Sequence, residues 1–275
     1  MDKPVGPTSH DVVAAARRAF RSSRVGHGGT LDPFASGLLL LFLGRSTRLM
    51  PYLVGLPKHY EGTIHLGVRT DTDDPQGRVV SEGEGWRDID DAQLADAAAA
   101  LTGTVSQVPP VYSAKKVGGV PAHRRVRRGE AVTLEPNEVE IRRFEITGRD
   151  GPLARFAAEV GSGTYLRALA RDLGAALGCG AHLEALRRTR VGPFDVREAV
   201  APSQFPCAVW PLAAALPHLP HRSLDDAEYE AVRQGRAIAA RAEEPGPVAL
   251  FHAALLVAVA AREGDVVQPR TVLAG

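Results

Sequence analysis

The sequence predicts an α+β protein in which a large mixed domain is followed by a small β-rich module. Its 275 residues suffice for a full hydrophobic core and suggest one large domain with a smaller companion. Helix-spaced and strand-spaced apolar patterns both occur before a proline-rich segment, residues 201–221. Beyond it, the pattern of 223–236 indicates a helix and that of 248–259 indicates short strands. We therefore expect two domains, at 1–205 and 206–275.

Composition is that of an ordinary globular protein. The formal net charge is +1 at pH 7, so a polyanionic partner must be attracted by a local patch. The two cysteines, Cys179 and Cys207, lie far apart and form neither a metal-binding spacing nor a disulfide framework. The sequence also lacks a signal-peptide pattern and an apolar stretch near the eighteen or so residues of a membrane span. These features predict a soluble cytoplasmic protein without a zinc or iron–sulfur site.

The first third of the chain is expected to hold a helix, a buried apolar segment and a strand. Apolar residues recur at four-residue spacing over 12–20, which predicts an amphipathic helix. The unbroken apolar run 38–43 fits a buried strand or a short core segment. Alternation over 60–66 predicts a half-buried strand, with Lys58 and Tyr60 at its start.

The middle of the chain continues with helices and strands. An apolar stripe over 88–103 predicts a packing helix. Between 139 and 146 the apolar parity shifts, as a β-bulge would require, and a further strand is expected at 155–160. Leucines and alanines over 166–177 predict a helix that ends at Gly178.

The loop GHGGTLDPFASG, residues 26–37, presents a single carboxylate, Asp32, directly before the buried apolar run. Its glycines permit unusual backbone angles, and Pro33 fixes φ after the aspartate. One reading of Asp32 is a turn residue that bonds its own backbone. The polar neighbours and the attachment to a core segment favour a rigidly held reacting group.

A basic segment lies between residues 115 and 128, with no acidic residue before Glu130. It contains Lys115, Lys116, Arg124, Arg125, Arg127 and Arg128. A block of like charges is usually exposed and often binds phosphate, and nearby Tyr112 offers a stacking surface. We favour a nucleic-acid surface over a merely solvated face.

Three other features allow both structural and functional interpretations. Tyr60 fits the core of the sheet as well as a functional position at the mouth of a strand. Arg167, two residues after Tyr165, fits either the surface of a helix or a bidentate pair with a carboxylate or phosphate. The acidic run 71–74 lacks the glycine and glutamate of a calcium loop, so a solvated turn is expected.

Five motifs in order along the chain closely resemble the bacterial tRNA pseudouridine synthase B family. They are DKPVGPTS at 2–9, GHGGTLDPFASG at 26–37, KHYEGTIHLG at 58–67, PPVYSAKK at 109–116 and GTYLRALARDLG at 163–174. The resemblance extends over roughly residues 2–200. Five motifs at compatible spacing are far more specific than any one of them.

This resemblance implies a pseudouridine synthase catalytic domain with a mixed, largely antiparallel sheet flanked by helices. An RNA-binding insertion is expected around 68–135, and a PUA-like RNA-binding domain at the C-terminus. The implied reaction converts uridine 55 in the T loop of tRNA to pseudouridine by base flipping and an aspartate nucleophile. It implies a monomer that acts on tRNA with no cofactor, metal, membrane or protein partner.

The resemblance also assigns site residues. The catalytic residues would be Asp32, Tyr60 and Arg167. The substrate-binding residues that it assigns would be His27, Tyr165 and Leu186. The start of the strand at 58–60 and the basic segment add Lys58, Tyr112, Lys115, Arg124 and Arg125, which we also expect to bind the substrate. Two other functions remain open at this point: a non-catalytic RNA chaperone that folds tRNA through the basic segment, and a pseudouridine synthase that acts on ribosomal RNA.

Overall fold

The computed structural model describes residues 1–113, 115–126, 128–242 and 246–274. Its contacts divide the chain into two compact units. The first consists of Met1–Ser9, Leu31–Leu38 and Gly55–Ala199, and the second of His10–Thr30, Leu39–Val54 and Val200–Gly275. None of the helices in the described ranges is both long and apolar enough to cross a membrane.

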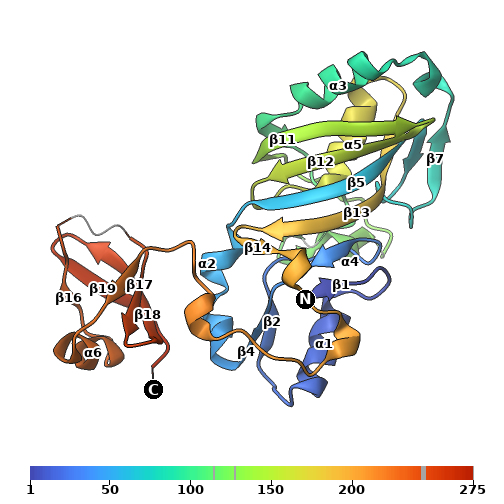
Figure 1. Ribbon diagram of the computed structural model, residues 1–275. Coiled ribbons are helices and arrows are strands. Elements are labelled where there is room, and N and C mark those ends of the chain that lie inside the picture. Colours follow the sequence, from blue (N-terminus) through green and yellow to red (C-terminus); the bar gives the residue numbers. More distant parts are fainter. Residues whose placement is uncertain (114, 127, 243–245, 275) are drawn as a thin grey trace. The chain divides into compact units, whose positions relative to one another are not determined.

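The first unit is built on an eight-stranded mixed sheet (Figure 1). The strand order is β1-β3-β13-β5-β12-β11-β8, and β14 pairs with β13. The strands are β1 (Asp2–Lys3), β3 (Ser36–Leu38), β5 (Lys58–Leu66), β8 (Gly103–Gln107), β11 (Asn137–Asp150), β12 (Leu153–Val160), β13 (Ala181–Val191) and β14 (Phe194–Asp195). The β3–β13 pair is parallel and the other pairs are antiparallel. The predicted α+β class with a mixed, largely antiparallel sheet is confirmed.

Two helices, α3 (Asp91–Ala100) and α5 (Leu166–Ala176), pack against this sheet. Leu94 of α3 and Leu173 of α5 are fully buried in one hydrophobic cluster with Ile64 of β5 and Phe156 of β12. Tyr60, Ile64 and Leu66 of β5 contribute to this side, as the alternation over 60–66 predicted. The bulge expected at 139–146 is present as a register shift between β11 and β12 after Ile141.

The apolar run 38–43 is divided between two strands rather than forming one. Leu38 ends β3, whereas β4 (Leu41–Leu43) pairs with β2 (Val25–His27) in the second unit. Between these strands the Leu40 carbonyl accepts a hydrogen bond from the Gly28 N–H at 2.9 Å. From this point the chain pairs with β2 instead of with β1 and β13. Periodicity could not reveal the break, since both halves are apolar.

Shorter elements complete the first unit. They are the hairpin β6 (Val68–Thr70) and β7 (Val79–Glu82), the turn η2 (Gly85–Asp88), the hairpin β9 (Lys116–Val117) and β10 (Val120–Pro121), α4 (Ala122–Val126) and η3 (Val196–Glu198). The hairpin β9–β10 and α4 carry the basic segment.

The second unit contains a helical part and a small β domain. The helical part comprises most of α1 (Ser9–Ala19), with η1 (Gly44–Leu49) and α2 (Pro51–Val54). The proline-rich segment forms the short turns η4 (Pro202–Gln204) and η5 (Leu212–Ala214). A five-stranded sheet follows in the order β15 (His221–Ser223), β17 (Val248–His252), β18 (Leu255–Glu263), β19 (Val266–Val272) and β16 (Ile238–Ala239), with α6 (Asp226–Arg233). The predicted β-rich, PUA-like module is confirmed as a fold.

Candidate active site

The N-terminal segment of the chain holds the loop around Asp32 in place. The buried Lys3 ammonium donates hydrogen bonds to the carbonyls of Ala35 at 2.7 Å and Pro4 at 2.9 Å. The Ser9 hydroxyl donates to the carbonyl of Leu31 at 3.0 Å and accepts from its N–H at 2.9 Å. Two of the recognised motifs therefore form one rigid unit, and this unit fixes Asp32 through its backbone.

The far end of the loop is fixed to β13. At Gly37, where φ is +106°, a Cβ atom would lie only 2.3 Å from the carbonyl oxygen of Arg188. Only glycine permits both this backbone angle and this approach. Arg188 is 1% exposed, and its Nε donates to the Leu38 carbonyl at 2.7 Å. The position of Asp32 is thus set relative to the strand that carries Leu186.

Asp32 forms a forked ion pair with Arg167, which lies in the first turn of α5. The Arg167 Nε is 3.0 Å from one carboxylate oxygen of Asp32, and its Nη2 is 3.4 Å from the other. The Arg167 side chain is buried, so the interpretation of this residue as part of a helix surface is wrong. The alternative predicted from the sequence, a bidentate pair with a carboxylate, is what the structure contains.

A second carboxylate, Asp74, shares the same guanidinium. Arg167 Nη1 lies 3.4 Å from Asp74 Oδ2 and donates to the Thr72 carbonyl at 2.9 Å, while Nη2 donates to the Tyr112 carbonyl at 3.0 Å. Asp74 is buried and also accepts a hydrogen bond from the Thr72 hydroxyl at 2.6 Å. The expectation of a solvated turn is therefore wrong at Asp74.

Two arginines of α5 face the acidic run, in which Asp74 is buried and Asp73 is half-buried. Asp73 pairs with Arg171 at 3.2 Å, one helical turn after the pair of Asp74 with Arg167. The match between arginines four residues apart and adjacent aspartates was visible in the sequence. The spacing alone could not predict these ion pairs, because nearly a hundred residues separate the two segments.

The carboxylates of Asp32 and Asp74 differ in their exposure to solvent. The Asp32 side chain is 35% exposed, whereas that of Asp74 is 8% exposed. Burial raises the pKa of Asp32, and the negative charge of Asp74 adds to this, while the charges of Arg167 and Lys3 lower it. A ligand can therefore approach Asp32 while Asp74 stays inside. Arg167 keeps the exposed carboxylate oriented and favours its ionised form.

Tyr60 and Leu186 lie together beside the Asp32 loop. Both are buried in one hydrophobic cluster with Leu31 and Phe34, which flank Asp32 in sequence. Tyr60 is paired with Arg188 and Leu186 with Gly62 across the β5–β13 ladder. The structure thus brings together three of the predicted site elements: the loop, the start of β5 and the middle of β13.

Lys58 lies two residues before Tyr60 and on the same side of β5. It is buried, and its ammonium donates to the Leu56 carbonyl at 2.9 Å. Burial and the positive charge of Arg188 lower the pKa of Lys58 to about 8. Lys58 is therefore not placed on the surface of the unit, where an exposed phosphate would be contacted.

Tyr165 is held by a residue that sequence reasoning missed, Gln107 at the end of β8. The buried Gln107 side chain accepts from the Tyr165 N–H at 2.8 Å and donates to the Tyr165 carbonyl at 3.2 Å. Tyr165 directly precedes α5. The pair of hydrogen bonds fixes the start of the helix from which Arg167 projects.

The basic segment is less uniformly exposed than its composition suggests. The Lys115 ammonium donates to the side chain of Asn137 and, at 3.4 Å, to the Glu135 carbonyl. Arg125 is paired with Glu130 at 3.3 Å. Arg124 is exposed. Arg127 and the side chain of Lys116 lie outside the described residues.

The segment begins next to the ion pair, because the Tyr112 carbonyl is bound by Arg167. The remaining predicted residue, His27, belongs to β2 of the second unit. There its ring lies edge-on to that of His10, with the centroids 6.0 Å apart.

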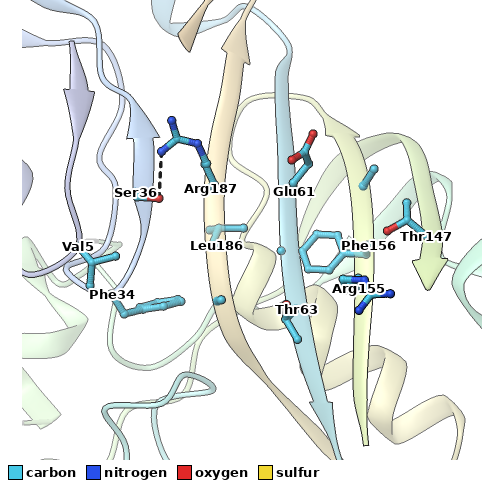
Figure 2. Close-up of a pocket in the computed structure, with 13 residues that line it drawn as sticks. Val5, Phe34, Ser36, Glu61, Thr63, Thr147, Arg155, Phe156, Leu186 and Arg187 are labelled. Carbon is cyan, nitrogen blue, oxygen red and sulfur yellow. Dashed lines mark hydrogen bonds between the residues drawn. The ribbon is translucent and has the colours of Figure 1, made fainter. Parts of the chain in front are cut away.

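A cavity of about 530 Å³ lies across the strands of the first unit (Figure 2). Phe34 and Leu186 line one part of it, and Arg155 and Thr147 another. Asp32 and Arg167 are not among the residues that line it. The cavity therefore adjoins the hydrophobic cluster of the site but is separate from the ion pair.

The chain is similar to known RNA-modifying enzymes over its whole length. The model of the N-terminal domain of the TruB family pseudouridylate synthases matches residues 17–166. The model of the tRNA pseudouridylate synthase B C-terminal domain matches residues 167–219. Both matched ranges include elements of the site.

Three similar curated proteins are named tRNA pseudouridine synthase B. The tRNA pseudouridine synthase B of Thermobifida fusca is 45% identical over 287 residues, which covers 100% of this chain and 97% of that protein. The protein of the same name from an Arthrobacter species is 45% identical over 258 residues, covering 90% and 84%. That of Leifsonia xyli is 50% identical over 205 residues, covering 72% and 68%.

Solved structures share the fold. A chain of an H/ACA ribonucleoprotein bound to a substrate RNA containing 2'-deoxyuridine superposes with a TM-score of 0.75 at 25% identity, covering 100% of this chain and 84% of that one. A chain of a Cbf5–Nop10–Gar1 complex gives a TM-score of 0.74 at 27% identity, covering 98% and 83%.

Proposed function

The chain belongs to the TruB family of pseudouridylate synthases, and from this we infer that it isomerises uridine to pseudouridine in tRNA. We propose that the substrate is the uridine at position 55 of the T loop. The observation that carries the proposal is the Asp32 carboxylate, which is accessible on one side and held by the Arg167 fork on the other. The site offers one oriented nucleophile beside an apolar wall.

The reaction needs no oxidant, reductant or carrier group. The bond from C1′ to N1 of uracil breaks, the base turns, and a bond from C1′ to C5 forms. The proton leaves C5, and N1 gains one, so substrate and product have the same composition. Attack of the carboxylate on C1′ of the sugar, which displaces N1 of uracil, and addition of the carboxylate to C6 of the base both require ionised Asp32, which Arg167 favours.

The neighbouring residues suit a flipped pyrimidine. Tyr60 and Leu186 supply an apolar surface next to the Asp32 loop, and we propose that Tyr60 stacks on the base and removes the C5 proton. Tyr165, fixed by Gln107, is proposed to hydrogen-bond with the flipped nucleotide. Lys58, with its lowered pKa, is proposed to contact the flipped nucleotide rather than an exposed phosphate.

The RNA outside the flipped base is proposed to contact the basic segment and the β-rich module. Tyr112, Lys115, Arg124 and Arg125 would meet the RNA backbone, and His27 would hold loop nucleotides. In this arrangement residues 1–205 form the catalytic domain, with an RNA-binding insertion around 68–135. Residues 206–275 form a PUA-like RNA-binding domain. We propose a cytoplasmic monomer that catalyses without a cofactor or protein partner.

The test is to map pseudouridine in RNA treated with the purified protein. We expect conversion of uridine 55 in unmodified tRNA and in a T-arm transcript, and none in ribosomal RNA fragments. A T arm left unmodified at stoichiometric enzyme would favour the RNA chaperone, which the exposed Arg124 makes the strongest alternative. If pseudouridine formed only in ribosomal RNA, the protein would be a pseudouridine synthase whose substrate is ribosomal RNA and not tRNA.

A second prediction concerns the salt dependence of RNA binding. Replacing Arg124 and Arg125 together by alanine should make the plot of log affinity against log salt concentration less steep. The slope should change by at most about 1.8 if each arginine neutralises one phosphate. Arg124 should account for the larger share, because Arg125 is paired with Glu130.

The matched control replaces Arg142 and Arg143, two adjacent exposed arginines of β11 that pair with glutamates. This control should leave the slope unchanged. Equal slopes for the wild type and the Arg124/Arg125 variant would show that the basic segment is not the RNA surface.

A further inference from the structure

Two histidines and a glutamate meet at one end of the β5–β13 pair. His65 of β5 lies directly opposite His182 of β13, and Glu184 is the extra residue of a β-bulge in β13. One ligand atom from each side chain lies within 4.8 Å of the other two. The two rings have centroids 5.3 Å apart. None of these three residues takes part in the proposed reaction.

The hydrogen bonds of His182 call for a cation. The ring Nδ1 is 2.9 Å from the Val68 carbonyl oxygen, and Nε2 is 3.1 Å from Glu184 Oε2. Both partners are acceptors, but a neutral imidazole carries only one N–H. If Nδ1 donates to Val68, the Nε2 lone pair faces a carboxylate. Either a second proton or a metal ion must lie between Nε2 and Glu184.

The donor set and its spacing suit zinc. Two imidazole nitrogens and one carboxylate oxygen form a known zinc ligand set, and tetrahedral zinc with bonds of about 2.1 Å places its ligand atoms about 3.4 Å apart. Glu184 Oε2 lies 3.1 Å from His182 Nε2 and 4.0 Å from His65 Nδ1, on either side of that value. The three ligand atoms lie within 4.8 Å of one another, so the side chains would move toward the ion when it binds.

The surroundings also resemble those of a metal site. The bond from His182 to the Val68 carbonyl is the outer contact that typically fixes the tautomer of a ligating histidine. The Glu184 side chain is 41% exposed, which leaves a route for the ion and room for a water ligand. Glu82, the partner of Val68 across the β6–β7 hairpin, adds negative charge near His65.

We propose that His65, His182 and Glu184 bind one Zn²⁺ ion, which clamps β5 to β13 and, through Val68, to β6. The ion would act structurally. The next residue of β13, Leu183, donates to the Asp73 carbonyl at 3.1 Å, and Asp73 precedes the carboxylate that shares Arg167. The site would therefore fix the base of the loop that supplies Asp74. The inference does not depend on the RNA substrate.

The experiment is zinc titration of the untagged full-length protein after treatment with a chelator, followed by calorimetry. We expect one zinc per chain and an increase in the melting temperature. His65→Ala and His182→Ala should each weaken binding by more than about 100-fold, since loss of an outer contact alone costs about 10- to 100-fold. Cobalt should give the visible absorption of a tetrahedral site.

The matched control is His59→Ala. His59 lies on the same strand and face as His65 and opposite a single glutamate, Glu159, at 3.9 Å. It should leave one zinc bound with unchanged affinity. If His182→Ala does not fold, Glu184→Gln at the exposed ligand gives the same test. Absence of stoichiometric zinc binding in the wild type, or binding that persists in both His65→Ala and Glu184→Gln, would overturn the proposal in favour of a protonated His182.

Discussion

Replacing Asp32 by asparagine is expected to slow pseudouridine formation by at least about 10⁴-fold, the scale seen when a nucleophile is removed. RNA binding should stay close to that of the wild type. The fold should survive because Lys3 and Ser9 hold the loop through backbone groups of Leu31 and Ala35, not through the carboxylate. Single-turnover conversion of a T-arm transcript, with binding measured in parallel, is the appropriate measurement.

Two other aspartates serve as controls for this variant. Asp71→Asn changes a carboxylate that pairs with the exposed Arg78, and it should leave the rate unchanged. Asp74→Asn should reduce the rate less than Asp32→Asn, because Asp74 is buried and acts through Arg167. A fully active Asp32→Asn enzyme would instead remove Asp32 from the reaction.

The parts of the site predicted from the sequence were those defined by local pattern. Asp32 was identified because glycines and a proline surround it before an apolar run. The position of Tyr60 followed from strand alternation, which the burial of β5 confirms. Arg167 was predicted as a partner for a carboxylate, although the sequence left a phosphate and a helix surface equally possible.

The parts that were missed depend on contacts between distant segments. Asp74 appeared as one of several turn acids, and only the packing of α5 buries it. Gln107 is a single polar residue at a strand end, and its role appears only when Tyr165 lies beside it. His65 and His182 meet through strand register. Composition likewise could not show that Arg125 is paired.

Replacing Arg167 should have the second large effect, and two variants separate its charge from its shape. Arg167→Lys keeps the charge, but a lysine cannot form the fork to Asp32 together with the other hydrogen bonds of the guanidinium. The nucleophile should then be misplaced, which should slow the reaction by about 10²-fold. Arg167→Met also leaves buried Asp74 without its cation, which should destabilise the fold by about 3–5 kcal/mol. Urea unfolding and single-turnover rates measure the two effects.

The pH dependence of these variants distinguishes an electrostatic role from a packing role. Arg167 lowers the pKa of Asp32 against the effect of burial, so its removal must raise that pKa further. Because the reaction needs the ionised carboxylate, the acidic limb of the rate profile should move to higher pH in Arg167→Met.

The raised pKa of Asp32 also determines how the stability of the fold changes with pH. A carboxyl group whose pKa is higher in the folded state favours folding at low pH, and this contribution is lost as the pH rises through the folded value. Arg167→Met should therefore lose stability relative to the wild type as the pH rises through the further raised pKa of Asp32. Arg171→Gln, one helical turn away at the Asp73 pair, should leave the limb of the rate profile in place. A limb that did not move in Arg167→Met would mean that the guanidinium only fills space beside Asp32.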